Sequence, residues 1–212
     1  MPSVTRNPSK RRSARRAAVV AGLLEVVEEL LDAGELYTDI SVERLITAAG
    51  ISRSTFYVYF EDKGALLLAL AEDVVAKLVD TASGWWELPP DATRQDVEQA
   101  LRQIMEVYRA HDAMWQALVD AAAYDPNVRA SFHEIVGLAS SQLARHIREG
   151  QKAGSVRPDL DPRRTADWLT WMTERGHHQL AAGATKAELT KLAKAQSAIV
   201  WYTLYEGAPG RS

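Results

Sequence analysis

The sequence predicts an all-α protein of nine helices, built as a small N-terminal head and a larger helical body. Apolar residues recur at the three- and four-residue spacing of amphipathic helices along most of the 212 residues. No segment alternates apolar and polar residues for long enough to predict a strand. Hydrophobic residues make up 47% of the chain, which is enough to bury a sizeable core.

The first four predicted helices are delimited by capping residues at their starts and by glycines after their ends. Ser41, Ser52 and Asp62 are good N-caps, and Gly34 and Gly50 end helices. The fourth helix has a wide apolar girdle, which predicts that it is buried between the head and the body. The predicted limits are residues 14–32, 42–49, 53–60 and 63–82.

Five further helices are predicted after a loop at residues 83–91, which contains Pro89 and Pro90. Prolines just inside the start of two of them favour helix initiation. The five helices run from about Thr93 to Ala110, around residues 115–119, from Pro126 to the loop at Gly154, from Pro162 to Gly183, and from Thr185 through Leu204.

Composition excludes several classes of protein. The chain has no cysteine, so it forms no disulfide and carries no thiolate metal site. No apolar run reaches the roughly 18 residues of a membrane span, and no signal peptide is recognised. We therefore expect a cytoplasmic protein without a membrane partner.

Charge is distributed unevenly along the chain. Residues 1–24 hold six of the 25 basic residues and no acid, so 19 basic residues face all 28 acids in the remainder, a net charge of −9. A basic arm on an acidic body favours a polyanionic partner at one end. The alternative is a solvated tail without a partner. The predicted organisation is a disordered basic arm at residues 1–13, a DNA-binding domain at residues 14–63 and a helical domain at residues 64–212.

The segment from Ser41 to Phe60 predicts a helix-turn-helix. Gly50 lies between two short helices, where a positive φ is favourable only for glycine. Phe56 and Phe60 are four residues apart and are expected to pack inward, while Arg53 lies on the opposite face. The second helix of this motif, which ends at Phe60, is about 13 Å long and fits a major groove roughly 12 Å wide. This segment therefore predicts a DNA reader, the alternative being an ordinary helical hairpin.

The same residues resemble a known family. The run from Gly50 to Phe60, followed by Asp62-Lys63 and Ala65-Leu66-Leu67, resembles the TetR family of bacterial regulators. More weakly, residues 171–175 and 199–207 resemble its ethionamide-repressor (EthR-like) branch. The resemblance implies a homodimer through the eighth and ninth helices, which binds an inverted-repeat operator on double-stranded DNA and is released by a small hydrophobic effector.

The resemblance also implies which residues contact DNA. Arg53, Ser54 and Tyr57 correspond to positions that meet bases. Phosphate-contacting positions correspond to Ser41, Arg44, Thr55, Tyr59 and Lys63. Gly64 stands where the family usually has glutamate, and we expect it to weaken the first turn of its helix by about 1 kcal/mol and to loosen the connection between head and body.

Aromatic and apolar residues of the body are expected to line an effector pocket, since pockets between helices of bundles are mostly apolar with few polar groups. By resemblance, Thr170 and Thr173 lie where related proteins bond their ligand, and Ala139 replaces a bulky aromatic residue. The alternative is that this set is plain core. The candidates are Val97, Leu101, Ile104, Met105, Tyr108, Trp115, Phe132, Val136, Ala139, Trp168, Thr170, Trp171, Met172, Thr173, His178 and Trp201.

Other functions have less support in the sequence. His133-Glu134 lacks the second histidine of a zinc-protease motif, and no P-loop, dinucleotide loop or nucleophile elbow is present. We therefore expect no catalysis, no metal and no cofactor. The alternative to a ligand-released repressor is a helical interaction scaffold, or an activator on the same fold that no small molecule induces.

Overall fold

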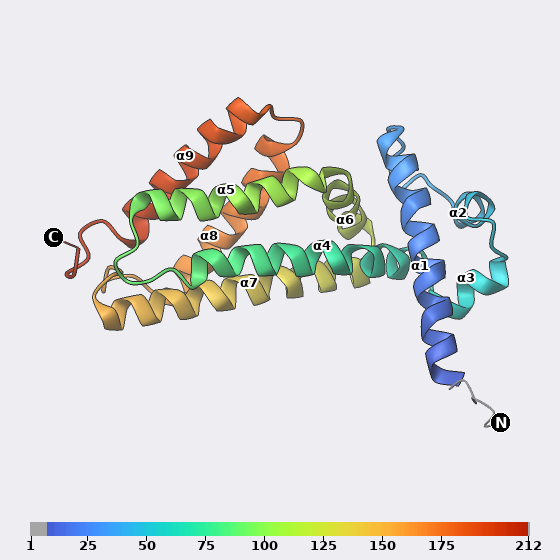
Figure 1. Cartoon of the computed structure of the whole chain (residues 1–212), viewed down its shortest axis with the longest axis horizontal. Helices are drawn as coiled ribbons and strands as arrows, with labels where there is room; N and C mark the ends of the chain where they lie inside the picture. The colour runs from blue at the N-terminus through green and yellow to red at the C-terminus, as the bar shows by residue number, and fades with distance from the viewer. Residues whose placement is uncertain (1–7, 212) are drawn as a thin grey trace, which may run out of the picture. The chain divides into compact units, whose positions relative to one another are not determined.

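The computed structural model describes residues 8–211 and contains no strand within that range (Figure 1). The predicted all-α class and the order of nine α-helices are confirmed, with one π-helical turn (η1) added. None of the described helices is both long and apolar enough to cross a membrane. The elements are α1 Pro8–Asp32, α2 Val42–Ala48, α3 Arg53–Tyr59, α4 Lys63–Trp86, α5 Arg94–Ala110, α6 Asp112–Tyr124, α7 Pro126–Ala153, α8 Pro162–Gly176, η1 His177–Ala181 and α9 Lys186–Leu204.

Backbone contacts divide the chain into two compact units. Within the described range, the head unit comprises residues 8–72 and 116–130, and the body unit comprises residues 73–115 and 131–211. The predicted domain boundary at residues 63 and 64 does not coincide with this division, because the first part of α4 and a segment of α6 and α7 pack with the head. The assignment of separate functions to residues 14–63 and 64–212 remains a prediction.

Helices α1 and α4 differ in length from the sequence prediction, as do α6, which spans Asp112–Tyr124, and α8, which ends at Gly176 before η1. Helix α1 begins at Pro8, six residues before the predicted start, and proline is favoured at the first helical position; the rest of the predicted arm, residues 1–7, lies outside the described range. Helix α4 continues to Trp86 instead of ending before Ser83. Trp85 is only 4% exposed, so its burial offsets the helix cost of the neighbouring glycine.

The helix-turn-helix forms as predicted. The Ser41 and Ser52 hydroxyls accept hydrogen bonds from the backbone N–H groups of Arg44 and Thr55, at 3.2 and 3.1 Å, and so cap α2 and α3. Gly50 has a φ of +63° in the turn between them. Phe56 is fully buried, which fixes the inner face of α3 in the head core.

Gly64 lies at a close approach between two helices of the head unit. A Cβ atom on Gly64 would lie 2.5 Å from Oδ2 of Asp125 and 3.0 Å from Cγ2 of Val128, so the start of α7 approaches α4 closely at this point. Asp125 also accepts hydrogen bonds from the backbone N–H groups of Asn127 and Val128, at 2.8 and 3.2 Å. Glycine here permits close packing inside the head unit. The expected loosening of the connection between head and body remains a prediction.

In the body unit, α9 packs along α5, and both helices are fixed at their starts by capping boxes. Thr93 and Asp96 exchange hydrogen bonds at the start of α5, as do Thr185 and Glu188 at the start of α9. The turn η1 continues α8 and turns the buried His177 into the core. Figure 1 shows α4 and α7 running alongside one another below α5.

Candidate DNA interface and body cavities

Helix α3 presents the three predicted base-reading residues on its outer face. Arg53, Ser54 and Tyr57 are all exposed, with Tyr57 at 45%, while Phe56 between them is buried. The Arg53 guanidinium lies 5.5 Å from the centroid of the Tyr57 ring, within cation–π range. An arginine and a phenol on one accessible face supply bidentate donors for guanine and an apolar edge for a thymine methyl group.

Both candidate DNA-contacting arginines of the helix-turn-helix are paired with glutamates. Arg53 is ion-paired with Glu43, and Arg44 donates from Nε to Glu35 at 3.0 Å. The hydrogen bond from Arg44 lowers the pKa of Glu35. These pairs are exposed, so each contributes little to stability and opens at small cost when a phosphate or a base competes.

The predicted phosphate contacts other than Lys63 lie at the surface of the same unit. Ser41 and Arg44 are exposed at the start of α2, and Thr55 and Tyr59 are partly exposed on α3. The Ser52 hydroxyl also lies 2.8 Å from that of Thr55. This placement is compatible with phosphate contacts, and the contacts themselves remain predictions.

Lys63 is placed differently from the prediction. Its Nζ donates to the carbonyl oxygens of Tyr37, Thr38 and Ile40, at 3.0, 2.6 and 3.0 Å. Three acceptors use all three donors of an ammonium group. The Tyr37 hydroxyl in turn donates to the Lys63 carbonyl at 2.6 Å, and burial lowers the pKa of Lys63. Lys63 therefore ties the 37–40 loop to α4 through its ammonium group. A contact of the same group with a DNA phosphate remains a prediction.

The body unit contains an apolar cavity of about 70 Å³. Eight of the sixteen predicted pocket residues line it, and they come from α5, α6, α7 and α8. These eight are Ile104, Tyr108, Trp115, Phe132, Val136, Ala139, Thr170 and Thr173. Their contact with an effector remains a prediction.

The other eight predicted pocket residues do not line this cavity. Met105 and Met172 border a neighbouring cavity of about 140 Å³, which Thr173 also touches. Trp168 is 79% exposed on α8, so it points to solvent in this chain. The helical spacing of these eight residues predicts an apolar face, but it does not determine which neighbouring element covers that face. The remaining five are Val97 and Leu101 in the core, the partly exposed Trp171 and Trp201, and the buried His178.

Sequence reasoning missed the contribution of α4 and of one acid. Leu78, Val79, Ala82, Trp85 and Trp86 line the cavity from α4. The wide apolar girdle of this helix is the sequence signal for this wall, but the same girdle also predicts packing between the head and the body. Ile135 and Leu143 of α7 complete the apolar wall, and Glu174 of α8 adds a carboxyl group.

Polar groups in the cavity wall are few and incompletely paired. Glu174 is 3% exposed, and no described group donates to its Oε2. The buried Nε1 of Trp115 likewise has no acceptor among the described residues. Burial raises the pKa of Glu174, against a smaller lowering by the neighbouring Arg175. An unpaired buried polar group costs about 1–3 kcal/mol, so these two atoms are places where a bound molecule can gain affinity.

A hydrogen-bonded chain lies beside the cavity. His177 Nε2 donates to Oε1 of Gln196 at 3.0 Å, and Gln196 Nε2 donates to the Thr173 hydroxyl at 3.0 Å. The Tyr108 ring meets the His177 ring edge-on, with centroids 4.8 Å apart. Burial lowers the pKa of His177 to about 4, so the imidazole is neutral at pH 7. The chain fixes Thr173, one of the few polar side chains at the cavity wall.

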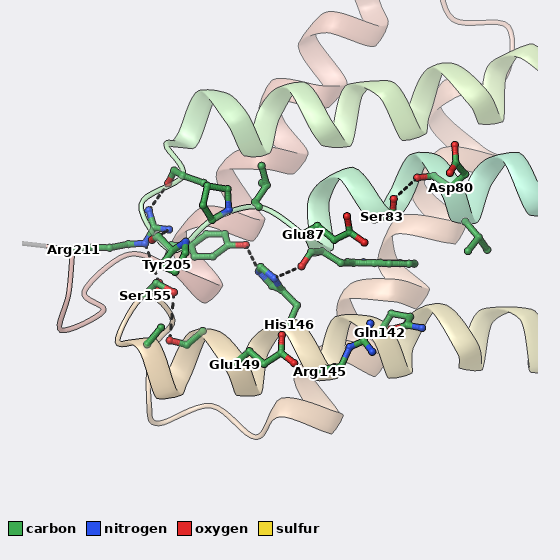
Figure 2. A pocket seen from close by; sticks show the side chains of 18 of the residues that line it. Asp80, Ser83, Glu87, Gln142, Arg145, His146, Glu149, Ser155, Tyr205 and Arg211 are labelled. Atoms are coloured by element: carbon green, nitrogen blue, oxygen red, sulfur yellow. Dashed lines mark hydrogen bonds between the residues drawn. The ribbon is translucent and has the colours of Figure 1, made fainter.

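A second, larger cavity of about 950 Å³ opens between the end of α4 and α7 (Figure 2). His146 lies at its wall, where Nδ1 donates to the Trp86 carbonyl and Nε2 lies 2.9 Å from the Tyr205 hydroxyl. Because the neutral His146 ring carries its proton on Nδ1, Nε2 accepts the hydrogen bond from the Tyr205 hydroxyl, which also accepts from Trp85 Nε1 at 3.2 Å. Burial lowers the pKa of His146, and this chain of bonds suits its neutral form.

Arg211 closes the far side of this second cavity. Its guanidinium donates to the carbonyl oxygens of Ser155, Ala92 and Pro90, at 2.9, 2.5 and 2.8 Å. It also lies 4.8 Å from the Tyr205 ring centroid. Figure 2 shows the two side chains next to one another. Arg211 is therefore occupied by the protein itself and fixes the C-terminal segment.

Several large apolar side chains on α8 and α9 are exposed. Trp168 on α8 is 79% exposed, and Ile199 and Tyr202 on α9 are 50% and 56% exposed. Leu180 of η1, which joins these two helices, is 61% exposed. Large apolar side chains exposed on neighbouring elements of this kind are candidates for an association site.

The described residues define an all-helical protein with a helix-turn-helix head unit and a cavity-bearing helical body unit. Comparison with known proteins agrees with this class. Residues 37–70 match the model described as bacterial regulatory proteins, tetR family, and residues 89–195 match the tetracyclin repressor-like C-terminal domain.

Individual relatives give the same result. The chain is 30% identical over 182 residues to the HTH-type transcriptional regulator EthR of Mycolicibacterium smegmatis, covering 82% of this chain and 80% of that protein. It is also 30% identical over 171 residues to EthR of Mycobacterium tuberculosis, covering 79% of each. A crystal structure of a TetR-family regulator from Syntrophomonas wolfei shares the fold, with a TM-score of 0.69, 17% identity, and coverage of 92% of this chain and 99% of that chain.

The chain belongs to the TetR family of bacterial transcriptional regulators. Its role is DNA binding and transcription regulation, and regulators of this family form dimers. The similarity to EthR extends over both the head and the body, so the predicted EthR-like resemblance is confirmed.

Proposed function

We propose that this protein is a homodimeric repressor that binds an inverted-repeat operator and is released by a small hydrophobic effector. The observation that carries the DNA-binding part is the outer face of α3, where Arg53, Ser54 and Tyr57 are exposed above a buried Phe56. Arg53 donates to the O6 and N7 atoms of a guanine, and Ser54 and Tyr57 contact the neighbouring bases. Ser41, Arg44, Thr55 and Tyr59 contact phosphates on either side.

The proposed dimer forms through α8 and α9. The exposed side chains of Trp168, Ile199 and Tyr202 supply the apolar surface that an obligate homodimer buries. In the DNA-bound dimer, the two copies of α3 lie about 34–36 Å apart, one turn of the double helix, and enter successive major grooves. The operator is then an inverted repeat, because a two-fold dimer reads the same half-site twice.

The proposed effector site is the apolar cavity lined by α4, α5, α6, α7 and α8. An effector acts by binding one dimer geometry more tightly than the other, and weakens DNA binding by that difference in affinity. The cavity of about 70 Å³ is small in the ligand-free chain, so an effector has to displace side chains such as Trp86 to enter. Displacement of α4 side chains provides the differential contact that the mechanism requires.

Size and stoichiometry of the operator complex test the proposal. Intergenic DNA beside the gene is footprinted, and the protected fragment is titrated with full-length protein in a sedimentation experiment. The proposal predicts a protected inverted repeat with two protomers, or a multiple of two, per repeat. Binding of one protomer to an asymmetric site contradicts the proposed dimer. A screen in which no apolar compound releases the protein from DNA contradicts the proposed effector.

The small cavity volume favours one alternative. A regulator on the same fold that no small molecule induces needs no enlargeable pocket, and about 70 Å³ is well below the ~300–1,000 Å³ of drug-sized sites. Calorimetry with apolar compounds distinguishes the effector-released repressor from this alternative. The alternative predicts no heat of binding at any concentration, although the protein still binds its operator.

A further inference from the structure

The cavity wall in the body unit contains one carboxyl group and no cation. Among the residues that line it, Glu174 is the only acid, and no lysine, arginine or histidine is present. The carboxyl is 3% exposed and its Oε2 accepts no hydrogen bond from any described residue. A buried carboxylate oxygen without a donor is costly, so a ligand that supplies a donor at this point gains affinity.

Aromatic rings form much of the wall around this carboxyl. The Tyr108 and Trp115 rings are stacked, with centroids 4.8 Å apart, and Phe132 and Trp86 line the same space. Aromatic faces attract organic cations, and more strongly when the cation is desolvated. Glu174 lines the same cavity as the stacked rings, and burial and the Glu174 carboxylate both raise the pKa of Tyr108.

We propose that the effector is an organic amine, with an apolar body held by the aromatic wall and an ammonium group that donates to Glu174 Oε2. This inference rests on the proposed effector function of the same cavity and adds the chemical class of the ligand. A carboxylate ligand is disfavoured, because its charge would face Glu174 without a basic residue to neutralise it. A neutral apolar ligand fits the wall but leaves Oε2 unpaired.

The class of ligand is tested with three probes of one shape: phenethylamine, 2-phenylethanol and phenylacetate. Each is titrated into full-length protein and followed by calorimetry and tryptophan fluorescence, since Trp85, Trp86 and Trp115 line the cavity. The proposal predicts that the amine binds at least about ten-fold more tightly than the alcohol, and that phenylacetate shows no measurable binding. Equal affinity for the amine and the alcohol overturns it, and this comparison needs no variant.

A variant pair then localises the effect. Glu174→Gln keeps the shape of the side chain and removes its charge, so amine affinity falls at least about ten-fold while alcohol affinity stays within two-fold. Glu106→Gln, an exposed glutamate on α5, changes the net charge equally and leaves both affinities unchanged. Loss of amine binding in both variants overturns a local role for Glu174.

The outcomes separate the inference from the proposed function on which it rests. If the alcohol binds as tightly as the amine and E174Q changes neither affinity, the cavity is an effector site but its ligand is not an amine. If none of the three probes binds and none stabilises the protein against heat, both the amine and the effector cavity are rejected. DNA binding by the head is unaffected by either result.

Discussion

Removal of the Lys63 ammonium tests whether this residue holds the head together or contacts DNA. In Lys63→Met the side chain keeps its length, while the carbonyl oxygens of Tyr37, Thr38 and Ile40 lose a donor that lies 2.6–3.0 Å away. A hydrogen bond to a charged group contributes about 1.5–3 kcal/mol, and water replaces part of three such bonds at a half-buried site. We expect a loss of about 3 kcal/mol in the free energy of unfolding.

Thermal unfolding is the assay. For a chain of this size, about 3 kcal/mol corresponds to a fall of about 6–12 °C in Tm. Lys77→Met is the matched control, because Lys77 is exposed on the same helix α4 and we expect its Tm to change by less than about 1 °C. At a temperature where K63M is folded, its DNA affinity should show the same salt slope as the wild type.

The reasoning about Lys63 is refuted by the opposite pattern. If K63M unfolds at the wild-type temperature while its slope of log affinity against log salt is shallower by about one, the ammonium contacts a phosphate in the complex and the loop bonds are incidental.

Three further predictions concern other parts of the molecule. Gly64→Ala should lower stability by about 1–2 kcal/mol in urea unfolding, because the new Cβ meets Asp125 at 2.5 Å and disturbs the cap of α7. Gly84→Ala is the control, and with open space around the new Cβ it should raise stability by about 0.5–1 kcal/mol. Equal effects of the two substitutions would mean that the close approach at Gly64 is unimportant. The folded-state pKa of His177, about 4, lies below the unfolded value of 6.5, so its contribution to the free energy of unfolding is complete above pH 6.5 and is lost as pH falls toward 4. At pH 5 this loss is about 2 kcal/mol relative to pH 7. In urea unfolding, His177→Gln should lack this pH-dependent loss, whereas His133→Gln should retain it. Trp168→Glu should yield monomers in sedimentation velocity while Tyr124→Glu, altering a residue 81% exposed in the head unit, leaves dimers; a dimeric W168E would exclude this face of α8.

Locally encoded features of the fold were predicted from the sequence. Ser41, Ser52 and Gly50 act on the two or three residues beside them, so the helix-turn-helix and its caps followed from short-range chemistry. The exposed edge of α3 followed from the four-residue spacing of Phe56 and Phe60.

Features that depend on distant contacts were not predicted. The hydrogen bonds of Lys63 to the 37–40 loop could not be predicted, because their acceptors lie 23 to 26 residues earlier in the chain. Glu174 was overlooked because an acid on an amphipathic helix normally faces solvent, and only the placement of α8 buries it. Helix α4 continues past Gly84 because Trp85 is buried, which is a tertiary effect that outweighs local propensity.

The measurement that tests the DNA-reading account most directly compares the dissociation constants of wild-type protein and Arg53→Ala. Each is measured by fluorescence anisotropy at one salt concentration, on the footprinted operator and on a scrambled duplex of equal length. Removal of a bidentate base contact costs about 1–3 kcal/mol, so R53A should bind the operator about 5- to 150-fold more weakly and the scrambled duplex within about three-fold. Arg102→Ala, an exposed arginine on α5, should match the wild type on both. Equal weakening of R53A on operator and scrambled DNA would contradict base reading by α3, and no weakening on either would contradict the interface itself.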